Sequence, residues 1–170
     1  EHFSLYDLSE KRSAQAREAA AERGLASRVT AEARDPLGEP PTKTMDLVYW
    51  DHALHHMLDV DHAVSWSVGM LRPGGVLAIN DYVGPPRLNW REEDVDAAQR
   101  FLEKEFSITG APSAAVRRPS RLRVLKLRLR DPSEAPQSHL IADAFQRHTG
   151  HAIRPIGGAV IHLCARFVVP

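Results

Sequence analysis

The first half of the chain alternates short apolar runs with segments of helical periodicity. The apolar runs lie at residues 2–7, 27–33, 45–50 and 76–81. Their lengths are typical of strands, and the last run, VLAIND, predicts a strand that is covered on both faces. Because strands that alternate with helices favour a parallel arrangement, the pattern predicts an α/β fold with a doubly wound, mostly parallel sheet.

Two helices are predicted between these strands. Ser9 can cap the first, which runs to about residue 23 and has Gly24 as its stop. The second has its apolar residues on one helical face, at Val60, Ala63, Val64, Val68 and Leu71. A Pro-Gly-Gly turn at 73–75 leads into strand 76–81, so residues 2–81 are predicted to be β-α-β-β-α-β.

Residues 84–137 have a different character. Prolines interrupt them, residues 92–105 hold six acids, and residues 117–130 hold seven lysines and arginines. Basic and apolar residues alternate in the last segment, which predicts an exposed strand with a cationic face. That cationic face either binds an anionic substrate or pairs with the acidic segment at 92–105. Residues 84–137 as a whole are predicted to be an inserted cap.

Regular patterning returns near the C-terminus. It predicts a helix at 138–148 and strands at 151–156 and 159–168, which Gly157 and Gly158 join as an antiparallel hairpin. The predicted organisation is a partial α/β core at 1–83, a cap at 84–137, and a C-terminal helix and hairpin of the core at 138–170.

Composition and charge narrow the classes of partner. The chain has 22 Lys and Arg against 22 Asp and Glu, and this neutrality argues against a dedicated binder of nucleic acid or membrane surfaces. No apolar run reaches the roughly 18–20 residues that span a bilayer. A single cysteine, Cys164, suits a reducing compartment. We expect a cytoplasmic protein with a small-molecule substrate, and leave a homo-oligomer open.

Four segments resemble the class I S-adenosylmethionine (SAM)-dependent methyltransferases. They are YDLSEKRSAQAREAAAERGL, EARDP, MDLVYWDHALHH and LRPGGVLAIND, which begin at residues 6, 32, 45 and 71. Three others, NDYVGPPRLNW, DPSEA and GGAVIHL, resemble a bacterial subgroup with a cap inserted after the fifth strand. The resemblance implies a Rossmann-like methyltransferase fold, SAM as the cofactor, and methyl transfer to a small-molecule or sugar-like acceptor.

The chain differs from this family at its start. The family's first strand and glycine-rich loop have no counterpart before Asp7, so we expect a chain that is truncated at its N-terminus. That strand lies at the centre of the family's sheet, between the second and fourth strands. We therefore expect the 170 residues alone to have no useful affinity for SAM.

The resemblance also implies cofactor-binding residues. Asp7 ends a strand and is predicted to accept hydrogen bonds from the ribose hydroxyls, with Leu8 against adenine. Asp35 is predicted to meet the adenine amino group, although an Asp-Pro pair equally favours a turn. The residues after strand 45–50 are predicted to face the methionine part of SAM: Asp51, His52 and Ala53.

His55, His56 and Asp81 are the predicted catalytic residues. Methyl transfer needs a base only if the acceptor loses a proton, and imidazole titrates near neutral pH. A structural alternative for His56 is a ring that bonds to the backbone.

The same histidines also raise the question of a metal, because His52, His55 and His56 share a helical face. A closed zinc site requires four ligands, and Cys164 is far away in sequence, so no metal is predicted.

Substrate contacts are predicted just after strand 76–81, at Tyr82, Arg87 and Trp90. The alternative for this segment is a rigid hinge for the cap at residues 84–86.

Two other functions remain open at this point. A nicotinamide-dependent Rossmann oxidoreductase shares the acid at the end of the second strand, but the HALHH motif and the terminal Gly-Gly hairpin disfavour it. A degenerate, methyltransferase-like interaction module is consistent with the missing glycine-rich loop.

Overall fold

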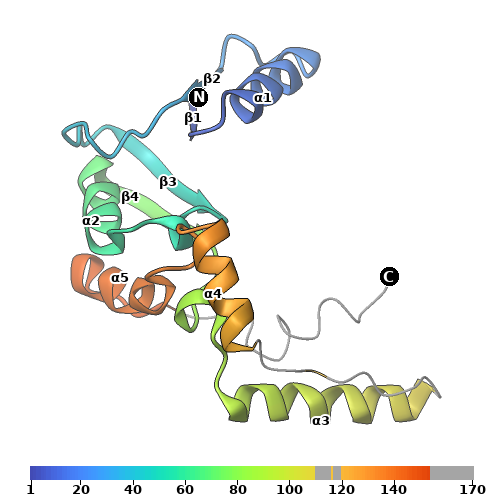
Figure 1. The fold of residues 1–170 in the computed structure, drawn as a ribbon. Helices are drawn as coiled ribbons and strands as arrows, with labels where there is room; N and C mark the ends of the chain where they lie inside the picture. The colour runs from blue at the N-terminus through green and yellow to red at the C-terminus, as the bar shows by residue number, and fades with distance from the viewer. Residues whose placement is uncertain (110–115, 117–119, 154–170) are drawn as a thin grey trace. The chain divides into compact units, whose positions relative to one another are not determined.

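The structure is a computed structural model of the chain that describes residues 1–109, 116 and 120–153. The chain divides into two compact units, Glu1–Pro41 and Thr42–Pro170, and each is described by itself. Figure 1 shows the helices and strands in chain order.

The first unit is a β-α-β element. It consists of strand β1 (Phe3–Asp7), helix α1 (Glu10–Glu22) and strand β2 (Val29–Ala33). The strands pair in parallel, with Asp7 opposite Ala33, and α1 packs against both. Ser9 caps α1 as predicted, by accepting a hydrogen bond from the backbone N–H of Arg12. The helix is followed, also as predicted, by Gly24, whose φ of 68° suits glycine.

The second unit contains the other parallel pair. It includes strand β3 (Met45–Asp51), helix α2 (Val60–Met70) and strand β4 (Leu71–Asn80). β4 begins directly after α2, where Leu71 pairs with Met45, and after an irregularity in the register Val76 lies opposite Leu47. A Cβ atom at Gly75 would lie 3.0 Å from the carbonyl oxygen of Met45, so any larger residue would crowd the ladder at this point.

In the described part of the chain, the strands form two separate sheets, β1–β2 and β3–β4. The α/β class and the parallel pairing are therefore as predicted, whereas a single doubly wound sheet is not formed by these strands.

Helix α2 buries its apolar face in the second unit. Val60, Ala63 and Val64 have no exposed surface. The hydroxyl of Ser67 on the same helix accepts a hydrogen bond of 2.8 Å from the indole N–H of Trp50, which ties β3 to α2. Helix α5 (Ile141–Thr149) packs against α2, and Figure 1 shows the two side by side.

One face of the β3–β4 pair is exposed among the described residues. Leu47, Tyr49 and Val76 have exposed fractions of 52%, 54% and 56%. The expectation that strand 76–81 is covered on both faces is therefore wrong for the described residues. The apolar pattern of a strand shows that both faces can be covered, but not which elements cover them.

The cap region contains helices α3 (Glu92–Thr109) and α4 (Arg121–Arg130). The prediction of a strand at 121–130 is wrong. Leucine, lysine and arginine are strong helix formers, and Ser120 caps α4 by accepting from the backbone N–H of Arg123 at 3.2 Å. On a helix, Arg123, Lys126 and Arg130 share one side because they are spaced i, i+3 and i+7, so the helical period and not the strand-like alternation arranges these cations. None of the described helices is long and apolar enough to cross a membrane.

The C-terminal helix is confirmed. Three short 3-10 helices, η1 (Leu54–His56), η2 (Pro86–Leu88) and η3 (Ser138–Leu140), occur in the second unit, and η3 leads into α5. Gly150 follows α5 with a φ of 73°. Residues 151–153 are irregular, and the rest of the predicted hairpin, with Gly157 and Gly158, lies outside the described residues.

Candidate active site

The central group of the candidate site follows the end of β4. Asp81 has a fully buried side chain. One of its carboxylate oxygens accepts hydrogen bonds from the backbone N–H groups of Ala53 at 3.0 Å and Leu54 at 2.7 Å. The other accepts from the N–H of Tyr82 at 2.6 Å and from Nδ1 of His55. Asp81 therefore holds η1 against the carboxyl end of the sheet.

His55 and Asp81 favour each other's charged forms. The hydrogen bond to Asp81 raises the pKa of His55 above its ordinary value, against the opposing effect of burial, and the charges of Asp81 and Glu134 add to the rise. Burial by itself would raise the pKa of Asp81, but the hydrogen bond and charge of His55, with two backbone N–H groups, bring it below its ordinary value. An imidazolium beside a carboxylate is the state that this geometry stabilises.

His56 is held by a segment that is distant in sequence. Its Nδ1 lies 3.1 Å from the carbonyl oxygen of Ser133 and 3.3 Å from the hydroxyl oxygen of the same residue. The Ser133 hydroxyl donates its only hydrogen to Asp131 at 2.6 Å, so both oxygens accept from Nδ1–H of His56. This arrangement leaves Nε2 of His56 as the nitrogen with a lone pair.

The DPSEA segment, residues 131–135, completes this part of the site. The rings of His55 and His56 lie 4.1 Å apart between centroids, and Nε2 of His55 lies 4.0 Å from a carboxylate oxygen of Glu134. Gln137, two residues after the DPSEA segment, accepts a hydrogen bond of 3.1 Å from the N–H of Val60 at the start of α2. The cap region therefore supplies side chains to the end of the sheet.

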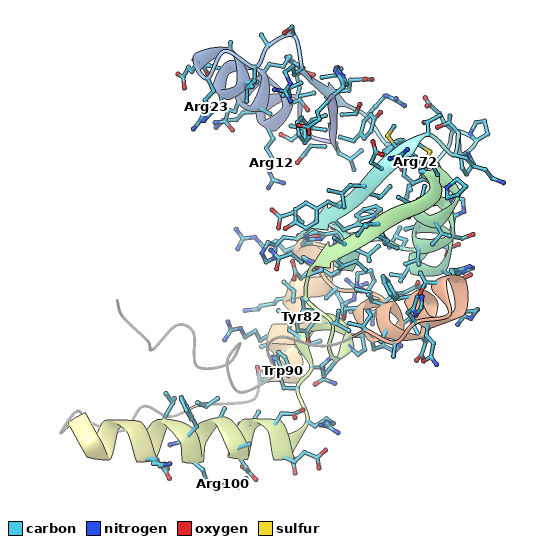
Figure 2. The ribbon with its side chains drawn as sticks, turned by 180° about the vertical axis from the view of Figure 1, so that it is seen from behind. Arg12, Arg23, Arg72, Tyr82, Trp90 and Arg100 are labelled. Carbon is cyan, nitrogen blue, oxygen red and sulfur yellow. The ribbon has the colours of Figure 1, made fainter. Side chains whose placement is uncertain are left out.

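Tyr82 lies between the histidines and the start of the cap. Its ring is edge-on to the rings of His55 and Trp90, at centroid distances of 6.4 and 5.5 Å. Figure 2 shows Tyr82 and Trp90 in the segment that follows β4. The Tyr82 hydroxyl donates to the carbonyl oxygen of Pro85 at 2.9 Å, and burial raises the pKa of this phenol above its usual range. Tyr82 is therefore a hydrogen-bond donor and not a base.

Arg87 is engaged by the DPSEA segment. Its guanidinium donates to the backbone carbonyl oxygens of Pro132 and of Glu134, the latter at 3.1 Å. Its own backbone N–H donates to the carbonyl oxygen of Ala135 at 2.8 Å. Arg87 and Ala135 both have positive φ values, of 58° and 46°, which are uncommon for residues other than glycine and often accompany functional sites.

The end of β3 carries the three residues predicted at the methionine part of SAM. Asp51 accepts hydrogen bonds from the Asn80 side-chain amide at 2.8 Å and from the Tyr49 hydroxyl at 3.2 Å. His52 has a φ of 50°, and its N–H donates to the carbonyl oxygen of Asn80. Ala53 is the residue whose N–H meets Asp81. The loop thus follows β3 and lies beside the carboxyl end of the parallel strand β4, and ligands of open α/β sheets bind at such ends.

The other predicted cofactor residues lie in the first unit. The Asp7 carboxylate accepts from the N–H of Ser9 at 2.7 Å and pairs with Arg12 at 3.3 Å. Leu8 has an exposed fraction of 77%. Asp35 accepts from the N–H of Leu37 at 2.9 Å, which is the turn interaction foreseen as its alternative.

A small hollow lies beside Asp7. Its volume is about 200 Å³, below the roughly 300–1,000 Å³ of most ligand pockets. It is lined by Leu5, Tyr6, Asp7, Arg12, Ser13, Ala16 and Ala31. By its size, this hollow accommodates only part of a nucleotide-like ligand.

The structure brings together residues that were predicted for separate roles. The catalytic candidates His55, His56 and Asp81 lie together with Ala53 and with the substrate candidates Tyr82, Arg87 and Trp90. Sequence reasoning missed Ser133, Glu134 and Gln137. The DPSEA motif is a feature of the resemblance, but no local pattern indicated that this segment contacts His55 and His56 in the fold.

Comparisons with known proteins show what part of the chain is similar to. Residues 2–79 match the family model described as a methyltransferase domain, which extends from β1 to β4. The chain is also 33% identical over 90 residues, 52% of its length, to the 27-O-demethylrifamycin SV methyltransferase of Amycolatopsis mediterranei (strain S699). The aligned part spans 33% of that relative. Both matches are to methyltransferases.

Proposed function

We propose that this protein transfers a methyl group from SAM to a small-molecule or sugar-like acceptor. The observation that carries the proposal is the match of residues 2–79 to the methyltransferase domain. The name of the relative gives 27-O-demethylrifamycin SV as what that enzyme methylates, and we infer a small organic acceptor for this protein as well. Members of the methyltransferase family generally use SAM, which is why we propose it as the cofactor.

The proposed SAM contacts follow the ends of the parallel strands. Asp7 would accept from the ribose hydroxyls, with the exposed side chain of Leu8 against adenine and Asp35 at its amino group. Asp51, His52 and Ala53 would face the methionine part. These assignments are supported by the position of each residue at or shortly after a strand's carboxyl end, and His52 adds a strained backbone there.

The proposed chemistry is an in-line displacement at the methyl group of SAM. SAM supplies the activated methyl, so the protein mainly holds acceptor and cofactor in line and excludes water. Asp81 would act by positioning, because its oxygens are occupied by N–H groups. The imidazole of His56 remains as a group that can receive a proton from a hydroxyl acceptor, whereas His55 in its imidazolium form would be a hydrogen-bond donor. Tyr82, Arg87 and Trp90 would border the acceptor.

The test is isothermal titration of SAM into the 170-residue chain and into the same chain with its natural flanking sequence. We expect the extended form to bind SAM. The Asp7→Ala variant of the extended form should no longer bind it. Asp46→Ala is the matched control, because Asp46 is exposed and pairs only with Arg72 among its described contacts. Formation of S-adenosylhomocysteine in the presence of acceptor mixtures then tests transfer itself.

The rival functions predict other results in the same experiment. Binding of NAD or NADP in place of SAM would support an oxidoreductase. Failure of both folded forms to bind either cofactor would contradict the proposed function and support an interaction module.

A further inference from the structure

The candidate site contains a ligand set that the sequence did not predict. One donor atom from each of His55, His56 and Glu134 lies within 4.8 Å of the other two. On sequence alone no metal is predicted, because Cys164, the single cysteine, lies far from the histidines. Folding brings Glu134 to them from 78 positions away along the chain, counted from His56. We propose that these three side chains bind a divalent transition-metal ion.

Both histidines are oriented as metal ligands usually are. Metal-binding imidazoles almost always donate their second ring N–H to a carboxylate or a backbone carbonyl, which fixes the tautomer and the ring plane. His55 donates Nδ1–H to the buried carboxylate of Asp81, and His56 donates Nδ1–H to the carbonyl oxygen of Ser133. Each ring therefore presents Nε2 to an ion, which at His55 would replace the Nε2 proton of the imidazolium form.

The third ligand is positioned by the backbone around it. Arg87 holds the carbonyl oxygen of Glu134, and the neighbouring Ala135 is fully buried. The Glu134 carboxylate lies 4.0 Å from Nε2 of His55. Bonds of about 2.0–2.2 Å to one ion place tetrahedral donor atoms roughly 3.5 Å apart, so the ion would draw these two atoms together by about 0.5 Å.

The donor set indicates the class of ion. Two imidazoles and one carboxylate suit Zn²⁺, Co²⁺ or Fe²⁺, whereas Mg²⁺ and Ca²⁺ prefer all-oxygen sites. Three protein ligands leave at least one position for water or for an oxygen of a bound molecule. The side chains of His55 and Glu134 have exposed fractions of 10% and 24%, so the site is largely shielded but open to solvent at the carboxylate.

The test measures metal binding directly, without SAM or acceptor, so it stands apart from the proposed methyl transfer. Zn²⁺ is titrated calorimetrically into the metal-free chain with its natural flanking sequence and no histidine tag. We expect one equivalent to bind. His56→Gln and Glu134→Gln should each weaken binding by roughly tenfold or more. Co²⁺ should produce a visible absorption band that both variants lose.

Matched controls use residues outside the cluster. His139 and Glu93 are exposed, and His139→Gln and Glu93→Gln should leave the affinity unchanged. Circular dichroism checks that each variant is folded. Two results would overturn the proposal: no stoichiometric binding by the folded chain, or binding that His56→Gln and Glu134→Gln leave intact.

Discussion

At the scale of single residues, one buried carboxylate organises the candidate site. Asp81 accepts from backbone N–H groups on both sides of the site and from the ring of His55. Each of these hydrogen bonds is part-buried. Removing the carboxylate would therefore leave several donors without an acceptor at the same time. The residue therefore has a structural role whether or not it also takes part in chemistry.

Replacing Asp81 with alanine should be strongly destabilising. Removing one partner of a buried charged pair costs about 3–5 kcal/mol of unfolding free energy, because the remaining groups stay buried without partners. Urea unfolding measures the change. Asp46→Ala is the control, because Asp46 and its partner Arg72 are largely exposed and such pairs contribute roughly 0–1 kcal/mol. Equal effects of the two substitutions would contradict the role of Asp81.

The pair should also give a pH-dependent stability. The pKa of Asp81 is lowered from 3.8, so its contribution is present above pH 3.8 and is lost as the pH falls through the lower native pKa. The pKa of His55 is raised from 6.5, so its contribution is present below pH 6.5 and is lost as the pH rises through the higher native pKa. The combined contribution is therefore largest between these two values.

Urea unfolding of the metal-free chain across this pH range measures that contribution. The difference in unfolding free energy between the natural chain and His55→Gln should be largest between pH 3.8 and 6.5. A difference that does not change with pH would show that the pair contributes no charge-dependent stability.

At the scale of elements, the start of β4 after α2 brings its backbone close to the backbone of β3. Gly75 passes near the carbonyl oxygens of Met45 and Arg72, where the ladder of β3 and β4 is irregular. The Pro-Gly-Gly sequence predicted a turn here but not that Leu71 would already pair with Met45. That pairing is decided by the partner strand, which a local pattern cannot indicate.

Gly75→Ala should destabilise the β3–β4 pair. Its Cβ would lie 3.0 Å from two backbone oxygens, and accommodating such crowding costs about 1–3 kcal/mol. Gly38→Ala is the control, because a Cβ there meets nothing within 4 Å, and its effect should stay within about 0.5 kcal/mol. Urea midpoints compare the variants, and similar losses for both would contradict the packing argument.

At the scale of the whole molecule, the methyltransferase match extends over parts of both compact units. Residues 2–79 include the first unit and the beginning of the second. A cofactor that binds only the folded chain stabilises it by RT ln(1 + L/Kd), which rises with L, the free concentration of the cofactor. SAM binding should therefore be visible in the stability of the chain as well as in a titration.

SAM should raise the melting temperature of the chain with its natural flanking sequence. At a SAM concentration 100 times its Kd, the unfolding free energy should rise by about 2.7 kcal/mol. Thermal unfolding followed by circular dichroism measures the shift, and NAD at the same concentration is the control. Stabilisation by NAD and not by SAM would contradict the proposed cofactor.

The sequence by itself determined the local elements of this protein. Apolar runs and helical periodicity located β1 to β4, α1 and α2, because strand and helix periods follow from backbone geometry. Ser9 and Gly24 marked the ends of α1 because capping uses neighbouring backbone groups. The same local reasoning failed at 121–130, where alternation suggested a strand but helix propensity and the Ser120 cap prevailed.

Only the tertiary structure decided which distant groups meet. His55 and Asp81 were both predicted as catalytic candidates, but their hydrogen bond depends on η1 folding over the end of β4. Ser133 and Glu134 reach the histidines because Arg87 and His56 bind the backbone of the DPSEA segment. Such contacts join residues far apart in sequence, and they are set by packing and hydrogen-bond satisfaction, which no local pattern records.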